Sequence, residues 1–307
     1  HATESTLPTM SPEDLPAPQL CRVPFEVPVA GGVLRGDIRS SGDASFSSGG
    51  RTKRLIVVCH GFKGFKDWGF FPFLAESLAT RAGATVVSFN FSGSGIGPDL
   101  ENFTDLEGFA RNTFSREAAD LEAILDGVRE GRLGEVRLGP PDSVGVLGHS
   151  RGAAAAILVG AVRPEVRAVV TWAGIGSVFR YEAWFSESLG EGDVMEVLNA
   201  RTGQRLPLHR DVLDDLRANR DALDMESAAH RLGAALLIVH GTADEAVPVA
   251  EAYSLHSAAV TAELAIIDGA GHTMDASHPF PGTNPRLDEA VSQSVAHFEA
   301  HLAQESR

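Results

Sequence analysis

Residues 148–152 read Gly-His-Ser-Arg-Gly, and no other stretch constrains the fold of this chain as strongly. An apolar run, residues 143–147, precedes this G-x-S-x-G pattern, and a helix-forming run, residues 153–159, follows it. The pattern therefore predicts a strand, a sharp turn and a helix, with the serine hydroxyl held out at the end of the strand. A glycine on each side leaves room for neighbouring backbone. The positive end of the helix would face the point where negative charge develops on a substrate.

Two later strand candidates place an acid and a base where such a serine needs them. Residues 236–239 are an apolar run that leads into a loop carrying Asp244, and residues 264–267 lead into a loop carrying His272. Each of the three polar side chains therefore follows the carboxyl end of a predicted strand, where open α/β sheets build their sites. We predict Ser150 as the nucleophile, His272 as its base and Asp244 as the acid that orients the imidazole.

Other residues compete for two of these roles. His278 is the alternative base, although the following Pro279 favours an extended backbone there. Glu245 and Asp268 are the alternative acids. Asp244 is preferred because its spacing after residues 239–241 matches the pattern of the family described next.

The chain resembles the α/β-hydrolase superfamily over roughly residues 22–304. Four motifs in order carry the resemblance: His60 to Gly64, Gly148 to Gly152, His240 to Pro248 and Gly269 to Thr273. The resemblance is to small bacterial serine esterases in the neighbourhood of dienelactone hydrolases, feruloyl esterases and prolyl oligopeptidase-like peptidases. It implies an α/β-hydrolase fold, with a mostly parallel twisted sheet and helices on both faces.

The same resemblance implies an oxyanion hole made by the backbone N–H groups of Phe62 and Arg151. His60 and Gly61 would support the loop that carries Phe62, and His149 would pack under the nucleophile turn. The Arg151 guanidinium is open to two interpretations, a contact with a substrate carboxylate or a salt bridge to a nearby Asp or Glu.

One domain is expected in spite of the length. At roughly 150 residues per domain, 307 residues would suggest two domains, but strands and helices alternate over residues 22–307 as in a single α/β unit. Residues 1–21 are rich in Pro, Thr, Ser and Glu and are predicted to form a flexible tail. Residues 40–50 are rich in Ser and Gly and are predicted to form a mobile loop.

The alternation breaks at about residues 174–230, where a helical cap over the site is predicted. Aromatic side chains in and near this cap would line an apolar substrate pocket, with core or cap packing as the alternative interpretation. The residues predicted for the pocket are Trp68, Phe179, Trp184 and Phe185.

Charge and composition exclude several partners. The net charge of −15 argues against nucleic acid and anionic membrane surfaces, and no run of about 18 apolar residues predicts a membrane span. No metal and no cofactor is predicted, because no Cys/His cluster has ligand spacing. His297 and His301, four apart on the last predicted helix, are interpreted as an exposed face.

The lysines are few and unevenly placed. The only three are Lys53, Lys63 and Lys66, and the last two lie beside the predicted oxyanion loop. They indicate either an anionic substrate or ordinary solvated loop side chains.

The sequence thus predicts a serine hydrolase that cleaves small carboxylic esters through an acyl-enzyme. The same residues would also serve a peptidase, a thioesterase, a lactone hydrolase or an acyltransferase, and a non-catalytic ligand-binding protein is the alternative from another class. A monomer or a homodimer is expected. The chain begins at His1 rather than Met, so a removed leader or a tag remnant is expected. The cytoplasm is the expected location, with secretion left open.

Overall fold

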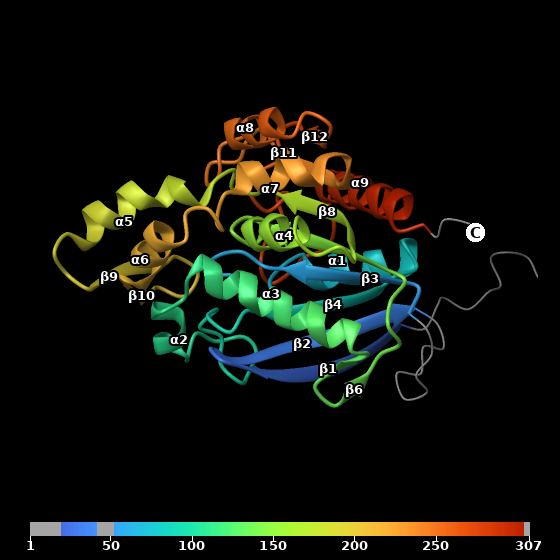
Figure 1. The fold of residues 1–307 in the computed structure, drawn as a ribbon, viewed down its shortest axis with the longest axis horizontal. Coiled ribbons are helices and arrows are strands. Elements are labelled where there is room, and N and C mark those ends of the chain that lie inside the picture. The colour runs from blue at the N-terminus through green and yellow to red at the C-terminus, as the bar shows by residue number, and fades with distance from the viewer. Residues whose placement is uncertain (1–19, 42–51, 304–307) are drawn as a thin grey trace, which may run out of the picture.

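An eight-stranded sheet forms the centre of the molecule (Figure 1). The computed structural model describes residues 20–41 and 52–303. The strands lie in the order β1-β2-β4-β3-β7-β8-β11-β12. The pairs β1–β2 and β2–β4 are antiparallel, and every other pair is parallel. The strands are β1 (Leu20–Val29), β2 (Gly32–Ser41), β3 (Arg54–Cys59), β4 (Thr85–Asn90), β7 (Ser143–His149), β8 (Val166–Trp172), β11 (Leu236–Gly241) and β12 (Glu263–Ile267).

This arrangement confirms the predicted α/β-hydrolase fold class. Every residue of β4 and β11 is buried, and so are all but the first residue of β3 and β7, because helices cover both faces of the parallel part of the sheet. A tight hairpin turn at Ala30 and Gly31 joins β1 to β2. The predicted tail, residues 1–21, lies outside the described residues except for Leu20 and Cys21, which begin β1. Most of the predicted loop at residues 40–50 also lies outside them.

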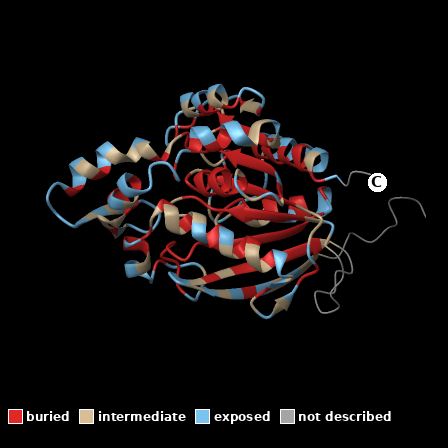
Figure 2. Ribbon diagram, in the orientation of Figure 1, coloured by how far each residue is buried: buried red, intermediate tan, exposed pale blue. Residues whose placement is uncertain are grey.

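Helices sandwich the sheet and build two hydrophobic cores. One core packs beneath α3, α4, α7 and α8, and the other beneath α1 and α9. Figure 2 shows the buried sheet between these layers. The helices are α1 (Phe71–Arg81), α2 (Leu106–Ala110), α3 (Phe114–Arg129), α4 (Gly152–Gly160), α7 (Met225–Leu232), α8 (Ala250–Ala258) and α9 (Pro285–His301), and a small ribbon pairs β5 (Arg132–Leu133) with β6 (Val136–Arg137).

The chain between β8 and β11 leaves the body of the molecule. It holds η2 (Val178–Tyr181), α5 (Glu182–Leu189), β9 (Val194–Asn199), β10 (Gln204–His209) and α6 (Asp211–Ala218), and it projects beyond the carboxyl ends of the strands (Figure 1). We call residues 177–223 the inserted segment. After it, α7 packs against α4 and α8 and so joins the body, followed by η3 (Gly233–Ala235).

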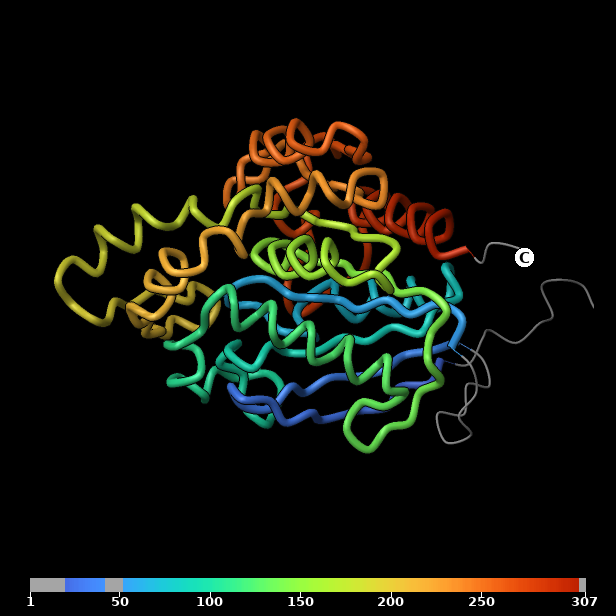
Figure 3. The backbone as a smooth tube through the Cα atoms, in the orientation of Figure 1, coloured from blue at the N-terminus to red at the C-terminus, as the bar shows by residue number. Residues whose placement is uncertain are grey.

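The inserted segment is only partly helical, which corrects the expectation of a helical cap. β9 and β10 pair as an antiparallel hairpin. Their burial alternates residue by residue, with Leu198 exposed and Asn199 buried, as in a strand that covers a surface with one face. The tube in Figure 3 shows the hairpin beside α6, at the far end from the C-terminus.

Two further observations concern the cysteines and the membrane. Cys21 and Cys59 are both free thiols. None of the helices in the described ranges has the length and apolar character needed to cross a lipid bilayer.

Candidate active site

Ser150 lies in a strained turn between β7 and α4. Its φ of 56° is in the left-handed region, which residues with a side chain rarely adopt. A Cβ on Gly148 would lie 2.4 Å from the Gly152 carbonyl oxygen, and one on Gly152 would lie 2.4 Å from that of His60. Both glycines are therefore required for the backbones to meet as they do. This is the strand–turn–helix geometry predicted from the sequence.

The structure brings Ser150, His272 and Asp244 into one hydrogen-bonded row. His272 Nε2 lies 3.0 Å from Ser150 Oγ, and His272 Nδ1 lies 2.8 Å from Asp244 Oδ2. Three loops, after β7, β11 and β12, supply the three side chains. A base in contact with the hydroxyl and an acid behind the base are the arrangement that activates a serine.

Asp244 is buried and held as an anion. Burial alone would raise the pKa of its carboxyl, but hydrogen bonds from His240, His272 and the Val247 N–H outweigh burial and hold that pKa well below its usual value. The Val247 N–H donates at 2.8 Å and the Ala246 N–H at 2.9 Å, both to Oδ1. Oδ2 is left to face His272 and His240.

His240 is a residue that the sequence reasoning did not single out. Its Nε2 lies 3.3 Å from Asp244 Oδ2 and 2.8 Å from the Val247 carbonyl oxygen. Its position four residues before Asp244, at the end of an apolar strand, was the available signal.

The alternative acids and base do not enter this row. Glu245 is exposed, and Asp268 accepts a hydrogen bond from the Thr242 hydroxyl. His278 Nδ1 accepts a hydrogen bond from the Gly69 N–H at 3.0 Å, and its ring stacks on Trp68.

His60 and His149 support the site as neutral rings. Burial lowers the pKa of His60 to about 4. Burial, followed by the nearby His272, lowers that of His149 to about 3. His60 Nδ1 donates to the Gly61 carbonyl oxygen at 2.8 Å, while its Nε2 accepts from the Phe91 N–H at 3.2 Å. His149 Nε2 donates to the His272 carbonyl oxygen at 2.9 Å, so it holds the backbone of the candidate base.

The loop after β3 lies directly against Ser150. A Cβ on Gly61 would lie 2.8 Å from Ser150 Cβ, so only glycine allows this approach. Neither the Phe62 N–H nor the Arg151 N–H donates a hydrogen bond within the described chain. These are the two N–H groups predicted to face an oxyanion, and α4 begins directly after Arg151 without a side-chain cap.

The Arg151 side chain turns inward to a salt bridge, one of its two predicted interpretations. Its Nε donates to Glu117 Oε2 at 2.9 Å, and its guanidinium lies 4.0 Å from the centroid of the Phe114 ring. Arg151 and Glu117 are both buried. The pair anchors the turn to α3, and Arg151 is not a free cation in the site.

A cavity of about 200 Å³ opens beside Ser150. Trp68 lines it as predicted, but Phe179, Trp184 and Phe185 do not. Phe185 packs in the core of the inserted segment, Trp184 is exposed, and Phe179 packs under the Arg220 guanidinium. The predicted pocket is corrected because these side chains of η2 and α5 are exposed or pack against other residues instead of lining the cavity. The lining residues are Gly61, Phe62, Lys63, Gly64, Trp68, Phe71, His149, Ser150, Asn199, Arg201, His272 and Thr273.

The two lysines beside the oxyanion loop have different environments. Lys66 is fully buried and forms ion pairs with Asp37 and Asp67, which tie the loop to β2. Lys63 lines the cavity, together with Asn199 and Arg201 from the inserted segment. The last two were missed because nothing in the sequence showed how this segment folds back.

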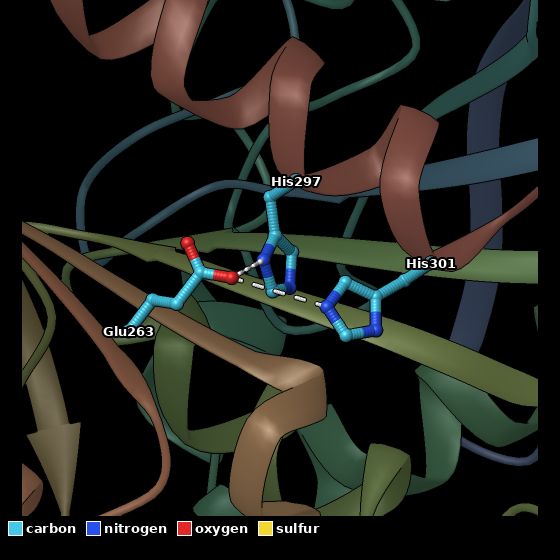
Figure 4. Close-up of side chains that lie close together, drawn as sticks. All are labelled: Glu263, His297 and His301. Atoms are coloured by element: carbon cyan, nitrogen blue, oxygen red, sulfur yellow. Dashed lines mark hydrogen bonds and ion pairs between the residues drawn. The ribbon is translucent and has the colours of Figure 1, made fainter.

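A possible metal-binding group lies outside this site. Glu263, His297 and His301 place one ligand atom each within 4.8 Å of one another (Figure 4). His297 is buried, which corrects the interpretation of this helix face as exposed.

Comparison with known proteins agrees with this fold. Residues 56–284 match the sequence model described as the alpha/beta hydrolase family. A search of curated proteins found no significant match.

Many solved structures share the fold. Est1E from Butyrivibrio proteoclasticus, with ferulic acid bound, superposes with a TM-score of 0.67 at 18% identity, covering 91% of this chain and 100% of that one. The esterase domain of a Rhodothermus marinus protein gives 0.61 at 19% identity, covering 93% and 100%. A cold-adapted esterase from an Arctic intertidal metagenomic library gives 0.57 at 16% identity, covering 96% and 100%.

Proposed function

The chain belongs to the alpha/beta hydrolase family, and from that premise we propose that it is a serine hydrolase that cleaves carboxylic esters through an acyl-enzyme. The hydrogen-bonded row Ser150–His272–Asp244, with distances of 3.0 and 2.8 Å, carries the proposal. The esterases among the structural neighbours support it.

In the first half-reaction Ser150 Oγ attacks the acyl carbonyl carbon while its proton passes to His272 Nε2. The carbonyl oxygen becomes an oxyanion and accepts hydrogen bonds from the Phe62 and Arg151 N–H groups, which have no other acceptor in the described chain. Asp244 stays ionised and stabilises the imidazolium. His272 then returns the proton to the leaving alkoxide, and the alcohol departs from the acyl-serine.

In the second half-reaction water replaces the alcohol. His272 takes a proton from the water, the hydroxide attacks the acyl-serine carbonyl, and the same two N–H groups hold the oxyanion. Collapse of this intermediate breaks the bond to Ser150 Oγ, which recovers its proton from His272, and the acid leaves. The cavity of about 200 Å³ is below the roughly 300–1,000 Å³ typical of drug-sized ligands, which favours small substrates.

The test is hydrolysis of p-nitrophenyl esters from acetyl to long acyl chains, with Ser150→Ala assayed in parallel. Loss of the nucleophile of such a triad costs about 10⁶-fold in kcat. We expect the variant to be inactive and the wild type to favour short chains. Intact-mass analysis after a fluorophosphonate probe should show one adduct on the wild type and none on Ser150→Ala.

The other reactions open to the same residues are separated by substrate. Aminoacyl-proline amides, thioesters and lactones are assayed beside the esters, and a preference for one of them over esters would replace the proposal. Less than tenfold loss in Ser150→Ala, or no adduct with the probe, would favour a ligand-binding protein on this scaffold.

A further inference from the structure

The cavity beside Ser150 has the opposite charge to the chain around it. The chain has 41 acidic and 26 basic residues, yet two of the twelve residues that line this cavity, Lys63 and Arg201, are basic, and none of these described lining residues is acidic. An enclosed wall of one sign attracts and orients a ligand of the other sign.

Neither cation is neutralised by a carboxylate within the described chain. Lys63 Nζ donates to the Leu198 carbonyl oxygen at 3.1 Å, which uses one of three ammonium protons. The Arg201 guanidinium lies 5.4 Å from the centroid of Phe65 and 6.0 Å from that of Phe103. Arg201 is exposed, its guanidinium lies near these two buried rings, and no acceptor for its side-chain N–H groups is found among the described residues.

Asn199 adds a third donor, and it is the most informative one. The residue is only 4% exposed, and its Nδ2 has no acceptor among the described residues. Its Oδ1 accepts from the Arg201 N–H at 3.2 Å, which fixes the orientation of the amide. A buried amide donor without a partner is unfavourable, and a ligand oxygen at this wall would satisfy it.

The three donors come from two segments that meet at this wall. Lys63 follows β3, whereas Asn199 is the last residue of β9 and Arg201 lies in the turn between β9 and β10. The bond from Lys63 Nζ to Leu198 holds the hairpin against the oxyanion loop. The lining also includes three aromatic side chains, Phe62, Trp68 and Phe71.

We propose that this wall binds a carboxylate carried by the substrate, so that the enzyme prefers esters bearing a free acid. The proposal rests on the function proposed above and names the substrate class of the same site. Lys63 and Arg201 supply charge, Asn199 supplies a neutral hydrogen bond, and the aromatic side chains accommodate the carbon skeleton. The carboxylate can belong to the acyl part or to the alcohol part.

Two matched substrate pairs distinguish these sources. p-Nitrophenyl hydrogen glutarate is compared with p-nitrophenyl methyl glutarate for the acyl side. 4-Acetoxybenzoate is compared with methyl 4-acetoxybenzoate for the alcohol side. In at least one pair we expect the wild type to favour the acid by tenfold or more in kcat/KM. Arg201→Gln and Lys63→Gln should each reduce that preference, the ratio of kcat/KM for the acid to kcat/KM for the neutral ester, at least fivefold.

Arg205→Gln is the matched control, because Arg205 lies on the same hairpin but pairs with Glu196 instead of lining the cavity. It should leave the preference unchanged. Equal rates for acid and neutral ester in both pairs, or a preference that survives both Arg201→Gln and Lys63→Gln, would overturn the inference while leaving the esterase function in place.

Binding gives a readout that does not depend on turnover. Calorimetric titration of Ser150→Ala with the acid and the methyl ester of each pair should show tenfold tighter binding of the acid in at least one pair, and Arg201→Gln in that background should remove the difference. If no ester is cleaved but the difference is present, the proposed function fails and the carboxylate site stands. If binding shows no difference either, both fail.

A separate observation concerns Glu263, His297 and His301, where α9 packs over β12 (Figure 4). Glu263 Oε1 lies 3.3 Å from His297 Nδ1 and 3.9 Å from His301 Nε2. In a tetrahedral zinc site with bonds of about 2.1 Å the ligand atoms lie about 3.4 Å apart. The three atoms thus approach the spacing of a shared metal ion.

The tautomer of His297 strengthens this interpretation. Its Nε2 lies 3.0 Å from the Ala235 carbonyl oxygen, which can only accept, so Nε2 carries the proton. Nδ1, the other ring nitrogen, faces Glu263 Oε1 and is therefore the atom that would bind a metal ion. A metal-bound histidine that donates its other N–H to a carbonyl is the usual second-shell arrangement.

We propose that these three residues bind a divalent transition metal, with zinc as the ion to test, and that it ties α9 to the edge of the sheet. Chelator-treated protein titrated calorimetrically with zinc chloride should bind one ion, and its Tm should rise. His301→Ala and Glu263→Gln should each weaken binding at least tenfold, whereas His230→Ala, an exposed histidine on α7, should not. No stoichiometric binding, or binding unchanged in both variants, would overturn the site.

Discussion

The edge of the sheet around Ser150 and the inserted segment are built by different means. Around Ser150 the contacts are backbone against backbone, with glycines at 61, 148 and 152 that no larger residue can replace without displacing a neighbour. The inserted segment is held by buried apolar side chains such as Leu213 and by ion pairs of partly exposed side chains, such as Arg220 with Glu182 and Arg180 with Glu251. In the first region, close contacts leave no room for larger side chains. The second region covers this site with side chains that can be replaced more easily.

Because the two regions are built differently, we expect them to have different roles in catalysis and in substrate recognition. The residues proposed as nucleophile, base, acid and oxyanion donors lie in the first, rigid region, and two of the three donors proposed to recognise a carboxylate lie in the inserted segment. Changes in the first region should therefore alter whether a bond is cleaved. Changes in the second should alter which substrate is accepted.

The largest effect is expected from Asp244→Asn. The amide would leave the His272 ring without an anionic partner and in the wrong tautomer, which in such triads lowers kcat about 10⁴-fold. The measurement is kcat on a short p-nitrophenyl ester. Glu245→Gln and Asp268→Asn are the matched controls and should stay within about threefold. A larger loss in either control would move the acid to another residue.

Next comes Glu117→Gln, which leaves the buried Arg151 guanidinium without its counter-charge. Breaking a buried pair in this way costs about 3–5 kcal/mol in the free energy of unfolding. Glu182→Gln breaks an ion pair of the inserted segment that is partly exposed and should cost less than about 1 kcal/mol. Denaturant unfolding at neutral pH measures both, and similar costs for the two variants would remove the contrast between the regions.

Gly61→Ala tests the contrast between the two regions through its effect on kcat. The new methyl group would lie 2.8 Å from Ser150 Cβ, so the oxyanion loop must move. Loss of one oxyanion donor typically lowers kcat about 10²–10³-fold. Gly192→Ala in the inserted segment would meet only the Leu189 carbonyl oxygen at 3.2 Å and should leave kcat within about twofold. Full activity of Gly61→Ala would show that the loop is less constrained than its contacts indicate.

The smallest effect is a pH dependence of stability that arises in the rigid region. The pKa of His60 is lowered by burial from 6.5 to about 4, and that of His149, also mainly by burial, to about 3. Below pH 6.5 the unfolded chain therefore binds protons that the folded chain does not, so stability is complete above that pH and is lost as the pH falls toward 4. Each histidine contributes a slope of about 1.4 kcal/mol per pH unit.

Asp120 gives the free energy of unfolding a pH dependence of the opposite sign over part of this range. Burial raises its pKa to about 6, so the folded chain keeps a proton that the unfolded chain loses above its model value of 3.8. The net slope between pH 4 and 6 should therefore be near that of one histidine. Denaturant unfolding between pH 4.5 and 7.5 measures this slope of the free energy of unfolding against pH. The slope should be smaller in His149→Gln and larger in Asp120→Asn. A slope unchanged in His149→Gln would mean that this ring is protonated in the folded chain.

Much of the rigid region was predictable because its constraints are local in sequence. The G-x-S-x-G turn, the apolar strands that precede Asp244 and His272, and the loop of Gly61 each carry their geometry in a few consecutive residues. Parallel strands then bring these loops to one edge of the sheet. The inserted segment was predicted less well, since its aromatic residues could line a pocket or pack within the segment, and the latter holds for Phe185.

What the sequence determined by itself was the fold class and the residues that the structure gathers at one edge of the sheet, because strand periodicity, glycine positions and the order of polar loops specify them. The tertiary structure alone decided that Arg151 is paired with Glu117, that Lys63 and Lys66 serve different purposes, and that Asn199 and Arg201 reach the cavity. These outcomes depend on contacts between distant parts of the chain, from Lys66 with Asp37, 29 residues apart, to Lys63 with Leu198, 135 residues apart. Such contacts follow from packing and burial, and neither has a signature in a short stretch of sequence.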